Sequence, residues 1–204
     1  MIGIIDYGLG NLKAFANIYK SLNIPFTIVS RAEDLADVSR IILPGVGSFD
    51  QAMRRLQDSG MRESLDEMVL SKKRPVIGIC VGMQILCRMS EEGKLNGLKW
   101  IEADTKKFGP SFTQEPICIP HMGWNDVRPL TTDGLFKGLD QESRFYFLHS
   151  YYVHCDTTKD VLAVATYGGE FACAVRHENI YGVQFHPEKS HQYGTRLLKN
   201  FSEI

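Results

Sequence analysis

Up to about residue 100, short apolar runs alternate with segments whose apolar side chains recur at helical spacing. The runs are aliphatic or β-branched and predict buried strands at residues 2–5, 26–29, 40–44 and 76–79. Helical spacing in the segments between them predicts helices at residues 11–22, 49–56 and 61–69. Because strands that are apolar throughout are buried on both faces, this order predicts a parallel sheet between two layers of helices.

Beyond residue 100 the pattern changes to strands that follow one another directly. Apolar runs are separated by hairpin signals such as Gly168-Gly169 and occupy residues 117–119, 145–153, 162–167, 171–175 and 180–185. They predict an antiparallel extension of the sheet, closed by a helix at residues 194–201. No repeat or linker divides the sequence, and its 204 residues suit one hydrophobic core, so we expect a single domain over 1–204.

The composition and charge argue against several classes of protein. The net charge of −1 gives no electrostatic argument for binding nucleic acid or a membrane surface. The five cysteines are an odd number and include no Cys-x-x-Cys pair, which argues against a disulfide framework and a zinc site. Residues 1–6 contain no basic region before a long apolar stretch, so neither a signal peptide nor a membrane span is expected. We therefore expect a cytoplasmic protein.

The fourth apolar run ends in a pattern that predicts a nucleophile. Residues 78–82 read Gly-Ile-Cys-Val-Gly, the cysteine counterpart of the Gly-x-Ser-x-Gly elbow between a strand and a helix. Glycines at both sides allow the strand and helix to approach, which leaves Cys80 on a sharp turn. The nearby helix N-terminus favours the thiolate. The alternative is a buried structural cysteine, the commoner role of free cysteine.

A thiolate nucleophile needs a base, and His186 is the best candidate among six histidines. It ends the apolar run at 180–185, and Glu188 follows two residues later. In an extended segment residues two apart face the same side, so Glu188 can orient the His186 ring. The alternative is a loop histidine beside a solvated glutamate. His121 is expected to have a packing role.

The end of the third strand offers hydrogen-bond donors for an oxyanion. Residues 44–47 read Pro-Gly-Val-Gly, and the amide of Val46 or Gly47 could act with that of Val81. The alternative is an ordinary turn between strand and helix. Residues 6–11 resemble a phosphate loop only weakly, since they lack the Gly-x-Gly-x-x-Gly spacing and no Walker lysine follows, so nucleotide binding is rejected.

These motifs, in this order, resemble the class I (triad) glutamine amidotransferases. The resemblance rests on residues 78–84 (Gly-Ile-Cys-Val-Gly-Met-Gln) and 182–190 (Gly-Val-Gln-Phe-His-Pro-Glu-Lys-Ser), and it extends to residues 6–11, 44–49 and 120–125. It implies a flavodoxin-like three-layer α/β sandwich that hydrolyses L-glutamine without a cofactor or metal. The implied catalytic triad is Cys80, His186 and Glu188.

The resemblance also implies substrate-binding and partner-binding residues. Substrate binding is implied for Gly47, Gln84, His149, Ser150 and Tyr151. The nearest subgroup is the glutaminases that form a heterodimer with a (β/α)8 cyclase subunit, which makes imidazole glycerol phosphate and AICAR in histidine biosynthesis. The implied interface residues are Asn11, Met122, Trp124, Tyr146 and Lys189. Two alternatives stay open: a paralogue that supplies ammonia for a bacterial surface sugar, and, more remotely, a cysteine peptidase of the same fold.

Overall fold

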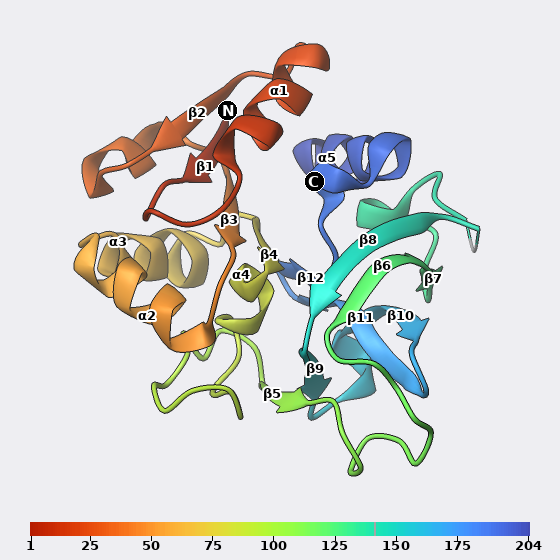
Figure 1. The fold of residues 1–204 in the computed structure, drawn as a ribbon. Coiled ribbons are helices and arrows are strands. Elements are labelled where there is room, and N and C mark those ends of the chain that lie inside the picture. Colours follow the sequence, from red (N-terminus) through yellow and green to blue (C-terminus); the bar gives the residue numbers. More distant parts are fainter. Residues whose placement is uncertain (141) are drawn as a thin grey trace.

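The protein is built around one long, twisted sheet, which the computed structural model describes for residues 1–140 and 142–204. Neighbouring strands along this sheet are β2 (Phe26–Val29), β1 (Ile2–Ile5), β3 (Arg40–Gly45), β4 (Val76–Cys80), β12 (Ile180–Val183), β11 (Glu170–His177), β10 (Val161–Thr166) and β7 (Arg128–Pro129). The strands from β2 to β12 run parallel, and β11, β10 and β7 continue antiparallel. The expected parallel sheet with an antiparallel extension is confirmed (Figure 1).

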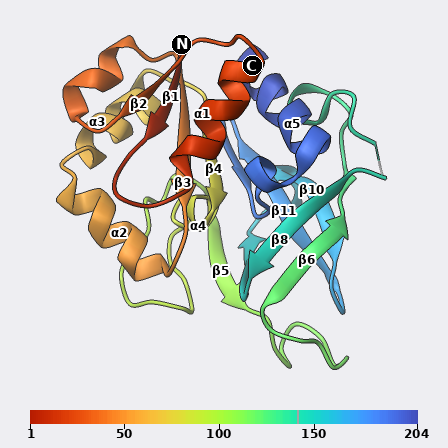
Figure 2. The same ribbon diagram turned by 45° about the horizontal axis from the view of Figure 1, so that its top comes forward.

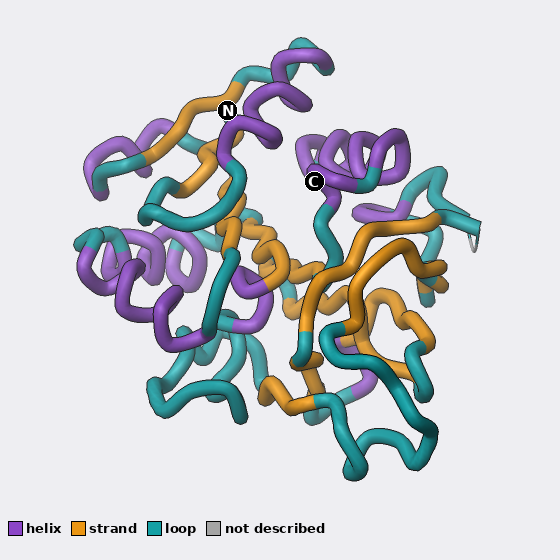
Figure 3. Tube along the Cα trace, viewed as in Figure 1, coloured by secondary structure: helices purple, strands orange, loops and turns teal. Residues whose placement is uncertain are grey.

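Helices cover both faces of the parallel part of the sheet. The helices are α1 (Leu12–Ser21), α2 (Phe49–Asp58), α3 (Arg62–Asp66), α4 (Val81–Gln84) and α5 (His191–Glu203). Figures 1 and 2 show α1 and α5 together on one side of β1, β3 and β4, with α2 and α3 on the other. A hydrogen bond from the Tyr19 hydroxyl to the Leu198 carbonyl joins α1 to α5. Figure 3 shows that the C-terminal half consists mainly of strands and loops.

Shorter helical turns complete the parallel half and its connections. A wider turn over Glu67–Ser71 continues α3, and single 3₁₀ turns cover Ala32–Asp37, Gly134–Phe136, Thr158–Asp160 and Pro187–Lys189. The strands of the parallel part are apolar because both faces are covered: all four residues of β1 and all five of β4 are buried. No helix within residues 1–140 or 142–204 has the length and apolar character needed to cross a bilayer.

The antiparallel half differs from the prediction in several places. The predicted strand at 145–153 is two strands, β8 (Arg144–His149) and β9 (Tyr151–Cys155), which belong to different sheets. β8 pairs with β6 (His121–Asp126) in a separate two-stranded sheet, whereas β9 pairs with β5 (Ala103–Lys107) and touches β11. The break lies at Ser150, whose carbonyl accepts a hydrogen bond from the Phe108 amide.

The predicted strand at 117–119 is wrong, because these residues form an irregular approach to β6. β5 was not predicted, since its sequence Ala-Asp-Thr-Lys-Lys is mostly polar. The last strand ends at Val183, before the predicted 185, and α5 begins three residues earlier than the predicted 194. Apolar runs therefore located the strands better than they located the strand ends.

Candidate active site

Cys80 occupies a strained turn between β4 and α4. It has φ +55° and ψ −113°, a conformation that non-glycine residues adopt only at a cost of about 1–3 kcal/mol. The turn is held by close backbone contacts: a Cβ added to Gly82 would lie 2.0 Å from the Leu43 carbonyl oxygen, and one added to Gly78 would lie 2.5 Å from the Gly82 oxygen. The two glycines let β3, β4 and α4 meet, and the strain falls on the one residue with a nucleophilic side chain.

His186 and Glu188 stand next to this turn because β12 is the parallel neighbour of β4. The register pairs Ile79 with Val183, and the chain continues past β12 into His186. Glu188 Oε1 lies 2.9 Å from His186 Nδ1, and the exposed fractions of the two side chains are only 3% and 4%. With Nδ1 engaged by the carboxylate, Nε2 remains for the Cys80 thiol. The three residues named from the sequence as a triad therefore lie side by side.

The electrostatics of His186 favour its protonated form. Burial opposes the imidazolium, but hydrogen bonds with the Cys80 and Glu188 side chains outweigh it, so the pKa of His186 is raised above its ordinary value. The second oxygen of the Glu188 carboxylate, Oε2, is buried and has no hydrogen-bond partner among the described residues. A carboxylate in this position stabilises the charge that an imidazole gains when it takes up a thiol proton.

Gln184 completes the surroundings of the thiol and was missed from the sequence. Its Nε2 lies 3.7 Å from Cys80 Sγ, and its Oε1 accepts a hydrogen bond from Gln84 Nε2 at 3.0 Å. The Leu148 carbonyl oxygen lies 3.8 Å from the same sulfur. The signal was available, since Gln184 precedes His186 by two residues in an extended segment and so faces the same side.

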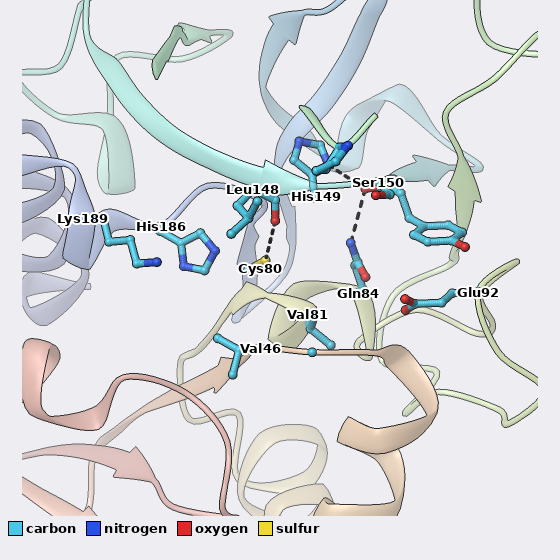
Figure 4. Close-up of a pocket in the computed structure, with 13 residues that line it drawn as sticks. Val46, Cys80, Val81, Gln84, Glu92, Leu148, His149, Ser150, His186 and Lys189 are labelled. Atoms are coloured by element: carbon cyan, nitrogen blue, oxygen red, sulfur yellow. Dashed lines mark hydrogen bonds between the residues drawn. The ribbon is translucent and has the colours of Figure 1, made fainter. Parts of the chain in front are cut away.

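Cys80 opens into a pocket of about 280 Å³. Ten predicted site residues line it: Val46, Gly47, Cys80, Val81, Gln84, His149, Ser150, Tyr151, His186 and Lys189. Glu92, Pro120 and Leu148 also line it and were not predicted. Figure 4 shows His186 and Lys189 on one side of Cys80, with Gln84 and Glu92 on the other. The pocket thus has a nucleophile at its centre and a carboxylate at one end.

Glu92 lies in a loop of polar residues, which gave no pattern from which to choose it. Its Oε2 accepts a hydrogen bond from the Phe49 amide at 2.7 Å, at the start of α2. This contact ties the loop that carries Glu92 to the segment that follows Gly47. At the other end of that segment the Tyr7 hydroxyl donates to the Pro44 carbonyl at 2.6 Å. Residues 45–48 are therefore anchored on both sides.

Four of the five predicted interface residues lie on one surface beside the pocket. The β6–β8 pairing sets Trp124 opposite Tyr146 and Met122 opposite Leu148, and 64% of Met122 is exposed. The Lys189 ammonium lies 5.6 Å from the centre of the Tyr146 ring. Asn11 lies on a different element, where its side-chain oxygen accepts from the Ala14 amide at the start of α1.

Across residues 1–140 and 142–204, no three side chains of the His, Cys, Asp or Glu type gather where they could hold a metal ion.

Two buried histidines behind the pocket lead to a prediction about pH. His121 Nδ1 and His149 Nε2 lie 3.0 Å apart, and burial lowers the pKa of His121 to about 4 and that of His149 to about 3. In the unfolded chain the imidazoles of His121 and His149 take up a proton near pH 6.5, whereas in the folded chain they stay neutral at that pH. The contribution to stability is therefore complete above pH 6.5 and is lost as the pH falls, by about 1.4 kcal/mol per pH unit for each histidine.

Urea unfolding at pH 7, 6 and 5 checks this expectation. His121→Phe removes one of the two titrating groups, so its unfolding free energy should fall less steeply between pH 7 and pH 5 than that of the wild type. The carboxylates contribute equally to the pH dependence of both proteins, so their contribution cancels when the two slopes are compared. Equal slopes would show that the buried histidines do not titrate as described.

Comparison with known proteins adds sequence relationships to this geometry. The family model described as glutamine amidotransferase class-I matches residues 3–204. A protein of Bdellovibrio bacteriovorus named imidazole glycerol phosphate synthase subunit HisH is 57% identical over 204 residues, the whole of both chains. A protein of the same name from Leptospira borgpetersenii is 52% identical over the same extent. A crystal structure titled as a glutamine amidotransferase superposes with a TM-score of 0.74 at 20% identity and covers 99% of this chain and 97% of its own.

Proposed function

Since the chain belongs to the class I glutamine amidotransferase family, we propose that it hydrolyses L-glutamine to glutamate and ammonia at Cys80. The observation that carries the proposal is that Cys80 and His186 line one pocket, with Glu188 hydrogen-bonded to His186. A buried thiol with an adjacent imidazole, itself oriented by a carboxylate, is the general arrangement for acyl transfer to cysteine.

The reaction then proceeds in two acyl-transfer steps. The Cys80 sulfur attacks the side-chain amide carbon of glutamine, and His186 donates a proton to the nitrogen as the C–N bond breaks, which releases ammonia. Water next attacks the thioester carbon while His186 accepts its proton. The C–S bond breaks, glutamate leaves and the thiol is restored. Glu188 holds the ring so that the same nitrogen faces the reacting atoms in both steps.

Both steps form a tetrahedral oxyanion that needs hydrogen-bond donors. The first amides of a helix have no partner within the helix, so the Val81 amide at the start of α4 is one proposed donor. Val46 and Gly47 line the same pocket and supply the other. The end of β3 meets α4 closely, since a Cβ on Gly45 would lie 2.3 Å from the Gly82 nitrogen. This contact supports a shared oxyanion site between the two segments.

The remaining pocket residues are proposed to bind the amino-acid part of glutamine. Gln84, His149, Ser150, Tyr151 and Gly47 all line the pocket. Gln84 Nε2 donates to the Tyr151 carbonyl at 3.3 Å, which ties helix α4 to the pocket wall at Tyr151. At the end away from His186, the Glu92 carboxylate offers a partner of opposite charge for the ammonium group of the substrate.

We further propose that the ammonia passes to a (β/α)8 cyclase subunit in a heterodimer, which makes imidazole glycerol phosphate and AICAR in histidine biosynthesis. The full-length relatives named as subunits of imidazole glycerol phosphate synthase support this acceptor over a surface sugar. The exposed face of β6 and β8, with Met122, Trp124, Tyr146 and Lys189, lies beside the pocket and is the proposed contact, together with Asn11 at the start of α1.

Affinity labelling tests the glutaminase activity directly. A chloroketone analogue of glutamine should modify one thiol per chain, at Cys80, and L-glutamine should protect it. Peptide mapping identifies the modified thiol. Cys118 is exposed and serves as the internal control, because any background labelling of this thiol should be the same with and without glutamine. Labelling of Cys80 that glutamine fails to block would contradict the proposal and favour the peptidase.

A further inference from the structure

The two histidines behind the pocket belong to a longer hydrogen-bonded chain. Asn125 Nδ2 lies 3.2 Å from His121 Nε2, and His121 Nδ1 lies 3.0 Å from His149 Nε2. His149 Nδ1 in turn lies 2.7 Å from the Tyr151 carbonyl oxygen. The chain thus runs from strand β6 to the wall of the substrate pocket through two imidazole rings.

The partners at its two ends fix the direction of every hydrogen bond. The Tyr151 carbonyl can only accept, so His149 carries its proton on Nδ1, and its Nε2 must accept. His121 then carries its proton on Nδ1, and its own Nε2 accepts from the Asn125 amide. That amide also donates to the Thr166 carbonyl at 2.9 Å, which orients it. A proton added to either ring would set two N–H groups against each other.

Aromatic packing keeps the rings in place and excludes other polar partners. The His121 ring is stacked on Tyr167 and Phe147, with ring centres 4.1 Å and 4.7 Å away. The His149 ring lies 5.3 Å from Phe108 by the same measure. Within such a setting a ring nitrogen that loses its partner has no replacement, and an unmet buried polar group is costly.

The chain meets the catalytic pocket at the Tyr151 carbonyl. This oxygen also accepts from Gln84 Nε2, whose second contact is Gln184 Oε1, and Gln184 in turn reaches Cys80 Sγ. One carbonyl oxygen is therefore shared by the histidine chain and by the glutamines beside the nucleophile. Its position therefore depends on two hydrogen bonds, one from His149 and one from Gln84, which Figure 4 draws as dashed lines.

We propose that His121 is a positioning residue for glutamine binding, which donates to His149 Nε2 and thereby holds the His149 ring and the pocket wall at Ser150 and Tyr151. This role rests on the proposed glutaminase function and deepens it. His121 itself does not line the pocket. It acts through His149, so its removal should weaken substrate binding more than it slows the chemical steps.

Two substitutions of His121 separate this role from simple packing. His121→Phe keeps an aromatic ring between Phe147 and Tyr167 but removes the N–H group, and should raise KM for glutamine about tenfold, the effect of one lost hydrogen bond. The value of kcat should stay within about twofold. His121→Asn restores a short side chain that donates, and should recover most of the wild-type KM. His154→Phe, at an exposed histidine on β9, is the control and should leave KM unchanged.

A spectroscopic readout tests the same inference without activity. In ¹⁵N-detected imidazole spectra, His149 of the wild type should be neutral with its proton on Nδ1 down to pH 5. His121→Phe should leave the proton on Nδ1 but shift the ¹⁵N resonance of His149 Nε2, which has lost its donor, and His121→Asn should shift it back. An unchanged His149 signature and an unchanged KM in folded His121→Phe would overturn the inference. If the wild type hydrolyses no glutamine, the function fails, but the spectra still decide the role of His121.

Discussion

Replacing Cys80 with alanine is expected to reduce glutamine hydrolysis by about 10⁴-fold or more, to background. Removal of the nucleophile from a triad leaves only the oxyanion donors and substrate binding, and these cannot form the thioester. The turn at residue 80 should keep its conformation. Alanine is smaller than cysteine, and the wild-type residue is already a non-glycine residue with a positive φ. The assay is release of glutamate from saturating glutamine.

The proposed heterodimer with a cyclase subunit offers a second test of the same variant. Product formation that depends on glutamine should be lost in Cys80→Ala, whereas formation supported by added ammonium should remain, because only the ammonia source has been removed. Cys87→Ala is the matched control, since Cys87 is also buried, lies outside the pocket and should be dispensable for both reactions. Loss of the ammonium-dependent reaction in Cys80→Ala would mean that the variant disturbs the complex, and retained glutamine hydrolysis would refute the assigned nucleophile.

Gly82→Ala is expected to destabilise the protein by about 3 kcal/mol and to abolish activity. The new methyl group would lie 2.0 Å from the Leu43 carbonyl oxygen, so the clash sets the backbone of β3 against the backbone of α4 that carries the methyl group. Neither can move without separating strands that carry the pocket, so the cost reaches the upper end of the range for overpacked sites. Urea unfolding measures the loss of stability.

Gly109→Ala provides the matched control, because a Cβ there meets no atom within 4 Å and the backbone is not in the left-handed region. Its unfolding free energy should lie within about 0.5 kcal/mol of the wild type. If both variants were equally stable, the tight approach of β3 to α4 would not be a requirement of the fold. The contrast tests why a glycine, and not another small residue, follows the nucleophile.

The parallel half of the fold could be predicted from the sequence because its signals are local. Strands β1, β3 and β4 are buried on both faces and so read as uninterrupted apolar runs. Each of these strands ends at residues that belong to the site or contact it. For this reason the elbow at Cys80 and the Pro-Gly-Val-Gly segment could be recognised from the sequence. His186 and Glu188 were paired by assuming an extended segment; Glu188 lies instead in the 3₁₀ turn Pro187–Lys189, which still brings its carboxylate to His186.

The antiparallel half could not be predicted to the same depth, because its arrangement depends on contacts between distant segments. No local signal divides residues 145–153 at Ser150; the division follows from β8 pairing with β6 and β9 pairing with β5. For His121 a packing role was preferred over contact with the site, because its two ring partners, His149 and Asn125, give no local signal in the sequence. Glu92 was missed for the same reason, since its role depends on the Phe49 amide.

Because β4 and β12 are neighbouring strands, the spacing of Cys80 and His186 does not depend on how many residues separate them in the sequence. Cys80 and His186 are 186 − 80 = 106 residues apart, yet one pair of adjacent strands sets their spacing. Loops within that interval, such as residues 109–116, can therefore lengthen, shorten or change composition during evolution without moving the thiol relative to the imidazole. The same strand pair can thus keep one chemistry constant while the intervening surface diversifies to suit different acceptor enzymes.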